Sequence, residues 1–142
     1  GVSPAASSKR RLLQEFGDLA ESAYGLNAPG VVEALIERET LGPTGVGHGV
    51  ALPHARFEGL ESVVGAFILL EKPVDFNSVD RQPIDIAFAL FAPEEAGVEH
   101  LKALAKVSRH LRESAICAKL RANPDAATLF TILTEGDKVQ AA

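Results

Sequence analysis

The sequence predicts an α+β fold, a three-layer α/β/α sandwich in which a small mixed β-sheet has helices on both faces. Helical periodicity occupies both ends of the chain, and apolar segments of strand length lie between them. Hydrophobic residues make up 46% and charged residues 23% of the 142 residues, which is typical of a globular chain with a buried core. Because no internal repeat or linker interrupts the pattern, we expect one domain over residues 1–142.

Two helices are predicted ahead of the strands. The first spans about residues 9–24, where leucine, phenylalanine and alanine recur at helical spacing behind a pair of serines that can cap the N-terminus. The second begins after Asn27, has Pro29 in its first turn and ends at Gly42. Both helices have one apolar face that can be buried.

Two strands and three more helices are predicted after residue 60. Val63–Leu70 is a continuous apolar run, and Pro83–Phe91 alternates large apolar residues with smaller or polar ones. A third helix is expected over about Val98–Leu111, a short helix from Ser114, and a last helix from Asn123. The residues of the third helix that we expect to be buried are Val98, Leu101, Leu104, Ala105, Val107 and Leu111.

Charge and hydropathy exclude several kinds of partner. The net charge is −5 and the sequence pI is about 5.3, so the chain lacks the basic stripe of a nucleic-acid-binding protein and is suited to basic protein surfaces. No apolar run approaches the roughly 18 residues of a membrane span, so no membrane insertion is expected. Residues 1–8 have no signal-peptide hydrophobic region and are expected to be an extended lead-in, and residues from Gly136 onward a frayed tail.

Cysteine usage indicates a reducing compartment. Cys117 is the single cysteine and therefore cannot form an internal disulfide, which favours a cytoplasmic protein. It lies on the apolar face of a predicted helix with no glycine-rich segment beside it. We therefore interpret it as a core residue and not as a reactive thiol.

His54 is the strongest candidate for chemistry. Most histidines in a globular domain are ordinary surface residues, and we assign no role to His48 or His110. His54, however, directly follows Pro53 after the apolar run Val50–Leu52, so we expect it on a stiff backbone at the end of a strand. The preceding loop is rich in glycine and could approach an anion, although a plain turn would have the same composition. It matches neither a Walker loop nor a dinucleotide fingerprint.

His100 is the second candidate. It lies in the first turn of the third predicted helix, where backbone N–H groups and the helix dipole favour a negatively charged group such as phosphoryl. A solvent-facing histidine with no function remains the alternative.

One segment resembles a known family. Residues 39–55 resemble the active-site signature of the fructose/mannitol-type (type 2) enzyme IIA domains of the bacterial phosphoenolpyruvate-dependent phosphotransferase system. The signature has an acidic or amide residue, here Glu39, then an aliphatic–glycine pair, here Val46-Gly47, and then aliphatic-Ala-aliphatic-Pro-His, here residues 50–54. The similarity extends over most of the chain and is greatest to the nitrogen-regulatory branch. At residue 48 the chain has histidine where many members have asparagine.

The resemblance implies a phosphohistidine carrier, a component of the phosphotransferase system. It implies that His54 accepts a phosphoryl group, and that Arg38 and His100 assist the transfer by donating to the phosphoryl oxygens. Neither a metal nor another cofactor is then expected, because the phosphoryl group passes between two histidines. The loop residues expected to bind the phosphate are Thr44, Gly45, Gly47 and Gly49.

The implied partners are a histidine phosphocarrier protein as donor and a downstream acceptor or regulated protein, with the oligomeric state open. The sequence does not separate sugar transport from nitrogen or carbon regulation, although the lack of a fused acceptor favours a free-standing regulator. Two alternatives stay open. One is a non-catalytic regulatory binding module of the same fold. The other is a metalloenzyme using His54 and His100, for which no carboxylate stands at a ligand-like spacing.

Overall fold

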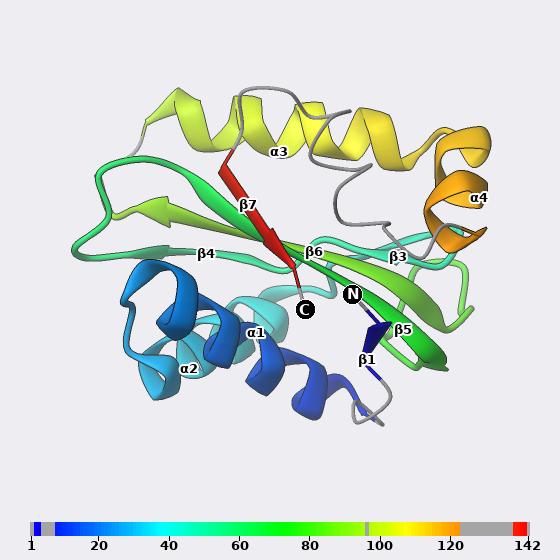
Figure 1. The fold of residues 1–142 in the computed structure, drawn as a ribbon, viewed down its shortest axis with the longest axis horizontal. Coiled ribbons are helices and arrows are strands. Elements are labelled where there is room, and N and C mark those ends of the chain that lie inside the picture. The colour runs from blue at the N-terminus through cyan, green and yellow to red at the C-terminus, as the bar shows by residue number, and fades with distance from the viewer. Residues whose placement is uncertain (1, 4–7, 96, 123–137, 142) are drawn as a thin grey trace.

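The computed structural model describes residues 2–3, 8–95, 97–122 and 138–141. A mixed β-sheet lies between two helical layers, with α1 and α2 on one face and α3 and α4 on the other (Figure 1). The predicted α/β/α sandwich is confirmed. The helix predicted from Asn123 lies outside the described residues.

The helices on the first face begin and end where the sequence predicted. α1 spans Lys9–Tyr24, capped by the Ser8 side chain, which accepts a hydrogen bond from the Arg11 N–H, and it stops at Gly25 in the left-handed conformation. α2 spans Ala28–Leu41 and is capped by Asn27. Since both caps are supplied by the residues next to the helices, these boundaries depend on local sequence alone.

The sheet is built around one long antiparallel pair, β5 (Val64–Val74) and β6 (Ile84–Pro93). Two short strands lie beside each of these: β1 and β7 run parallel to β5, and β3 and β4 run parallel to β6. β2 pairs antiparallel with β3 and forms an edge of the sheet. The short strands are β1 (Val2–Ser3), β2 (Gly45–Gly47), β3 (Val50–Ala51), β4 (His54–Phe57) and β7 (Lys138–Ala141).

Two expectations about irregular segments are corrected. The glycine-rich stretch before Val50 is not a plain loop, since β2 and β3 form a tight hairpin there. The chain beyond Gly136 is not a frayed tail throughout, because residues 138–141 pair with Val64–Phe67 of β5. The strands β2, β3 and β7 are too short to show alternation of apolar and polar residues. In addition, β7 pairs with a strand about 70 residues away in sequence.

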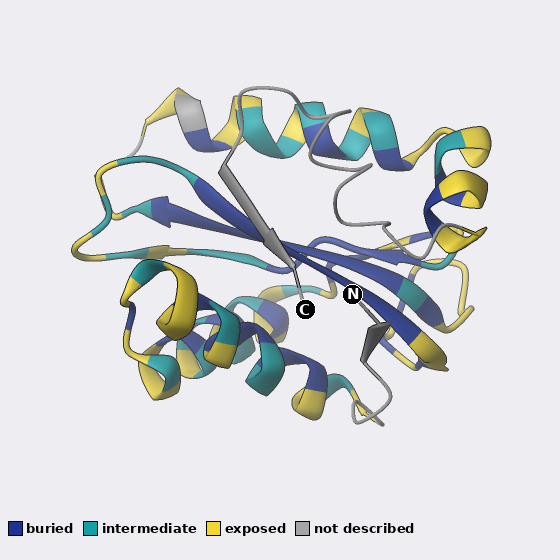
Figure 2. Cartoon of the chain, in the orientation of Figure 1, coloured by how far each residue is buried: buried dark blue, intermediate teal, exposed yellow. Residues whose placement is uncertain are grey.

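The sheet separates two hydrophobic clusters (Figure 2). Alternate residues of β5 and β6 point to opposite faces, so Ile68 packs under α1 and α2 whereas Phe67 packs under α3 and α4. Apolar side chains thus face both layers, and the two central strands are buried almost throughout.

The helices on the second face are α3 (Val98–Leu111) and α4 (Ser114–Ala122). The boundaries of α3 agree with the prediction, but its predicted buried face is wrong at three positions: Val98 is 62% exposed, Leu101 is 58% exposed, and Ala105 is exposed as well. The residues that face the sheet are Val107 and Leu111, with Leu104 partly buried. His100 lies seven residues, or about two helical turns, before Val107, so it is the first residue on the side of α3 that faces the sheet.

Candidate functional site

His54 lies at a break between two short strands. β3 ends at Ala51, and β4 begins at His54, which stands opposite Leu90 of β6. The carbonyl of Pro53 accepts a 3.0 Å hydrogen bond from the Leu90 N–H, so the break is fastened to the central strand. His54 was expected at the end of a strand, whereas the structure places it at the first residue of one. The backbone that carries it is held on both sides.

The ring of His54 is oriented by its own backbone neighbourhood. Nδ1 lies 2.8 Å from the carbonyl oxygen of Leu52. A carbonyl oxygen can only accept, so Nδ1 carries a proton and donates it. In the neutral ring, Nε2 then has a free electron pair and is the nucleophilic nitrogen.

The surroundings of His54 favour the neutral ring. Burial lowers the pKa of His54, and the positive charge of Arg38 lowers it further. The hydrogen bond to Leu52 and the negative charge of Glu39 act in the opposite direction. The net direction is downward from the ordinary value, so Nε2 is available as a nucleophile at neutral pH.

His54 points to the side of the sheet covered by α3. Ala55 and Phe57 pack against the core beneath α1 and α2, so the alternate residues His54 and Arg56 project to the other face. The ring of His100 lies there, with its centroid 5.4 Å from that of His54 and the two planes inclined by 45°. The two histidines expected to act together are therefore adjacent, although 46 residues separate them in sequence.

His100 is buried, so the solvent-facing alternative is wrong. It is 7% exposed, and neither of its ring nitrogens has a hydrogen-bond partner among the described residues. Burial lowers the pKa of His100; the charge that His54 carries when protonated and the positive charge of Arg56 lower it further. A buried neutral imidazole without partners can donate a hydrogen bond to an anionic oxygen that arrives beside His54.

A cavity of about 360 Å³ opens in front of His54. Arg38 reaches it from the C-terminal turn of α2, and its Nη1 donates a 2.9 Å hydrogen bond to the carbonyl oxygen of Gly42. Thr44 reaches it from the segment that leads into β2. The cavity is lined by Arg38, Pro43, Thr44, Val46, Leu52, His54, Leu101, Leu104, Ala105 and Ser108.

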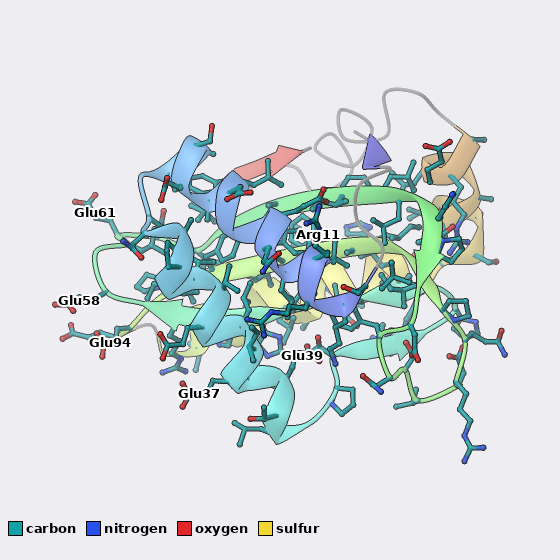
Figure 3. All side chains as sticks on the ribbon, turned by 90° about the horizontal axis from the view of Figure 1, so that it is seen from below. Arg11, Glu37, Glu39, Glu58, Glu61 and Glu94 are labelled. Carbon is teal, nitrogen blue, oxygen red and sulfur yellow. The ribbon has the colours of Figure 1, made fainter. Side chains whose placement is uncertain are left out.

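A larger cavity, of about 700 Å³, lies where β4 and β6 end. Its ionisable lining consists of carboxylates, among them Glu58, Glu61 and Glu94, which project at one end of the molecule (Figure 3). A cluster of carboxylates repels a phosphoryl group, and no histidine, cysteine, serine or threonine is among the described residues that line this cavity. We therefore place the candidate site at the smaller cavity, which contains His54 and Arg38.

Of the four residues predicted to bind phosphate, Thr44 alone is among those that line the cavity. Thr44 lies at the cavity, and Gly45 follows it on β2, packed so closely against Ser78 that a side chain at residue 45 would collide with it. Gly47 is the last residue of β2 and Gly49 lies in the hairpin turn, both with positive φ.

Charged side chains of both signs surround that turn. A side chain at Gly47 would meet Asp80 at 3.4 Å, and one at Gly49 would meet the Arg121 guanidinium group at 2.6 Å and Asp85 at 3.0 Å. Arg121 pairs with Asp85 at 2.8 Å and also donates to the carbonyl of His48. Neither glycine is among the residues that line the cavity, so the structure does not bring Gly47 and Gly49 together with His54 there, and their role in binding phosphate stays a prediction.

Arg56 is a residue of this site that the sequence analysis did not single out. It is exposed on β4, two residues after His54, and its charge acts on His100. The signal was available, since residues two apart on a strand share a face. Without knowledge that β4 is a strand, however, the period could not be applied.

Cys117 is buried, as predicted. It is 3% exposed, its thiol donates to the carbonyl of Leu111, and burial raises the pKa of the Cys117 thiol. These features describe an unreactive core residue.

The described residues contain neither a candidate metal-binding cluster nor a helix suited to span a membrane. No cluster of three or more His, Cys, Asp or Glu side chains that could hold a metal ion occurs in residues 2–3, 8–95, 97–122 and 138–141. Within the same part of the chain, no helix has the length and apolar character needed to cross a membrane.

Known structures share this arrangement of sheet, helices and chain path. The nitrogen regulatory protein IIA-Ntr from Neisseria meningitidis superposes with a TM-score of 0.85 at 38% identity, covering 93% of this chain and 90% of that one. The mannitol IIA of Escherichia coli superposes with a TM-score of 0.70 at 20% identity, over 92% and 91% of the two chains, which shows the shared fold. The fold is thus that of the enzyme IIA proteins.

The chain belongs to the family described as "Phosphoenolpyruvate-dependent sugar phosphotransferase system, EIIA 2", which matches residues 2–136. Among its relatives, the nitrogen regulatory protein of Bradyrhizobium diazoefficiens is 47% identical over 127 residues, covering 89% of this chain and 83% of the relative. The nitrogen regulatory protein of Escherichia coli is 38% identical over 129 residues, covering 90% and 79%. The family resemblance stated from residues 39–55 is confirmed.

Proposed function

We propose that this chain accepts a phosphoryl group on Nε2 of His54 from a phosphorylated histidine of a phosphocarrier protein. The Nε2 electron pair forms the new N–P bond while the N–P bond of the donor breaks, and the bonding pair of electrons returns to the donor imidazole. The proton on Nδ1 of His54 stays on the hydrogen bond to Leu52. Atoms and electrons balance between the two imidazoles.

The observation that carries this proposal is the 2.8 Å contact between Nδ1 of His54 and the Leu52 carbonyl. It selects the tautomer in which Nε2 is unprotonated, and it holds the ring in one direction. Phosphoryl transfer depends mainly on positioning and on stabilisation of the charge on the equatorial oxygens. An oriented nucleophile beside a cationic group meets both requirements.

Two side chains would receive the phosphoryl oxygens. Arg38 offers a planar set of donors at the cavity, and His100 offers a ring nitrogen without a partner among the described residues, next to His54. Thr44 lines the cavity, but its hydroxyl proton is already donated to Glu39. Arg56 adds a second positive charge on the side of His100.

The surface around the cavity suits a protein partner. Val46 and Leu101 line the cavity and remain 42% and 58% exposed, so an apolar rim surrounds the reactive ring. Exposed apolar side chains next to a functional group are typical of a surface that another protein covers. A phosphocarrier protein could thus bring its phosphohistidine to His54 and exclude water at the same time.

We assign the phosphorylated form a regulatory role in the cytoplasm. Two relatives that are 47% and 40% identical are named nitrogen regulatory proteins, whereas a fructose-specific EIIA component of Haloferax volcanii is 32% identical. A solved complex joins mannitol IIA to its phosphorylated IIB, so a protein with this fold meets a downstream partner. Up to about two negative charges at His54 would change which partners bind the apolar rim.

The test is phosphoryl transfer from a labelled, phosphorylated phosphocarrier protein. The wild-type chain should acquire acid-labile phosphate, His54→Ala should acquire none while keeping its fold, and His110→Ala, the matched control on the far part of α3, should behave as wild type. A folded wild-type protein that takes up no phosphate would favour the non-catalytic binding module instead.

A further inference from the structure

Glu39 is a buried carboxylate that the proposed transfer does not use directly. It is 9% exposed, near the end of α2, and follows Arg38 in the sequence (Figure 3). A buried carboxylate is costly unless its oxygens are paired. Glu39 meets this condition through contacts with two other segments of the chain.

Thr44 is the first of these contacts. Its N–H donates to Oε2 of Glu39 at 3.2 Å, and its hydroxyl group donates to Oε1. The backbone of Glu39 takes part as well, since its carbonyl accepts a 3.2 Å hydrogen bond from the Gly42 N–H. One residue thus holds both ends of the turn 42–44.

Lys9 is the second contact. Its ammonium group lies 2.7 Å from Oε2 of Glu39, and both side chains are largely buried, at 22% and 5% exposed. The same ammonium group lies 4.6 Å from the ring centroid of Phe76 and 3.3 Å from the side-chain oxygen of Asn77. Lys9 therefore fixes the carboxylate relative to α1 and to the segment that follows β5.

The turn that Glu39 holds carries two parts of the cavity. Thr44 lines the cavity itself, and the carbonyl of Gly42 anchors the guanidinium group of Arg38. Release of the turn would therefore displace a residue of the cavity wall and the anchor of a cationic donor together. A displacement of about 1 Å in such a site lowers a reaction rate by about a hundredfold.

Glu39 also acts on His54 through its charge. The charged groups that affect the pKa of His54 are Arg38 and Glu39, both from α2. Of these, Glu39 is the one that favours the protonated ring and so counters Arg38. Its charge is therefore measurable at His54 separately from its hydrogen bonds.

We propose that Glu39 is a positioning residue of the phosphoryl-accepting site: it holds the turn 42–44, and with it Thr44 and Arg38, while Lys9 holds Glu39. This inference rests on the proposed function of His54. It predicts that the acidic position of the family signature acts through the turn and not by touching the phosphoryl group.

The test combines two substitutions that separate hydrogen bonding from charge. Thr44→Val removes the hydroxyl donor and leaves every charge in place, so it should slow phosphoryl transfer at saturating donor by about tenfold without moving the titration midpoint of His54. Glu39→Gln removes the charge as well, so it should slow transfer and also move that midpoint to lower pH. Glu39→Asp, which keeps the charge, should leave the midpoint unchanged. The midpoint is followed by NMR of the imidazole protons.

The matched control is Glu37→Gln, an exposed carboxylate on the same helix (Figure 3), which should change neither quantity. Wild-type transfer rates in both Thr44→Val and Glu39→Gln would overturn the inference. If Glu39→Gln does not fold, Thr44→Val decides alone, and a wild-type rate in that variant overturns it. Failure of the wild-type chain to accept phosphate would instead refute the proposed function.

Discussion

The rings of His54, on β4, and His100, on α3, are adjacent: their centroids lie 5.4 Å apart and their planes are inclined by 45°. Nδ1 of His54 donates a hydrogen bond to the Leu52 carbonyl. Neither ring nitrogen of His100 has a hydrogen-bond partner among the described residues. The first ring is thus oriented for attack, and the second is free to receive an oxygen. This difference determines what each substitution should do.

Stability should fall as the pH decreases through the titration range of these two histidines. Both folded-state pKa values are lowered, so below about pH 6.5 the unfolded chain binds more protons than the folded one. The free energy of unfolding therefore decreases from about pH 7 downward, until the folded-state groups protonate as well. His100→Gln should weaken this decrease, as measured by urea unfolding at about pH 7.5 and about pH 5.5. An unchanged pH dependence in this variant would show that His100 is not the group responsible.

Replacement of Arg56 should change the pKa of His100. The positive charge of Arg56 lowers the pKa of His100, so Arg56→Gln should raise the NMR titration midpoint of His100 and slow phosphoryl transfer by a few-fold. Arg10→Gln is the control, because Arg10 is an exposed arginine on α1, beyond the opposite face of the sheet. Equal His100 midpoints in Arg56→Gln and the wild type would mean that the guanidinium group is too distant or too well screened to act.

Substitution of Arg38 by lysine should separate charge from geometry. Lysine keeps the positive charge but loses the planar set of donors that can meet both Gly42 and a phosphoryl oxygen. We expect the single-turnover transfer rate to fall by about tenfold, while the affinity for the donor protein changes little. Transfer at the wild-type rate in Arg38→Lys would show that Arg38 contributes charge alone.

Gly45 should tolerate no side chain. A β-carbon there would collide with Ser78, so Gly45→Ala should cost about 1–3 kcal/mol of unfolding free energy. Gly42→Ala serves as the control, because nothing lies within 4 Å of a β-carbon at that position. Denaturant unfolding of the two variants gives the comparison, and equal stabilities would contradict the packing described for β2 and Ser78.

The predictable parts of the structure are those encoded locally. Ser8 and Asn27 cap their helices from adjacent positions, so both helix starts could be placed from the sequence. β7 could not be placed, because its pairing with β5 is set by contacts distant in sequence. The buried face of α3 was misjudged because His100, a polar residue, occupies a position in its buried stripe.

The candidate site shows the same division. Residues 39–54 match one signature and Arg38 directly precedes them, so His54, Arg38 and Thr44 could be predicted together, and the structure places all three at one cavity. The hairpin turn that removes Gly47 and Gly49 from this cavity depends on Asp85 and Arg121, which are distant in sequence. The contact of Lys9 with Glu39 also joins residues that are distant in sequence, so no local sequence pattern predicts it.

The most direct test of the central claim identifies the nitrogen of His54 that carries phosphate. After incubation with a phosphorylated phosphocarrier protein, ¹⁵N- and ³¹P-resolved NMR should show phosphate on Nε2 of His54, with Nδ1 still protonated against the Leu52 carbonyl. Phosphate on Nδ1 of His54, on His100 or on no histidine at all would contradict the account.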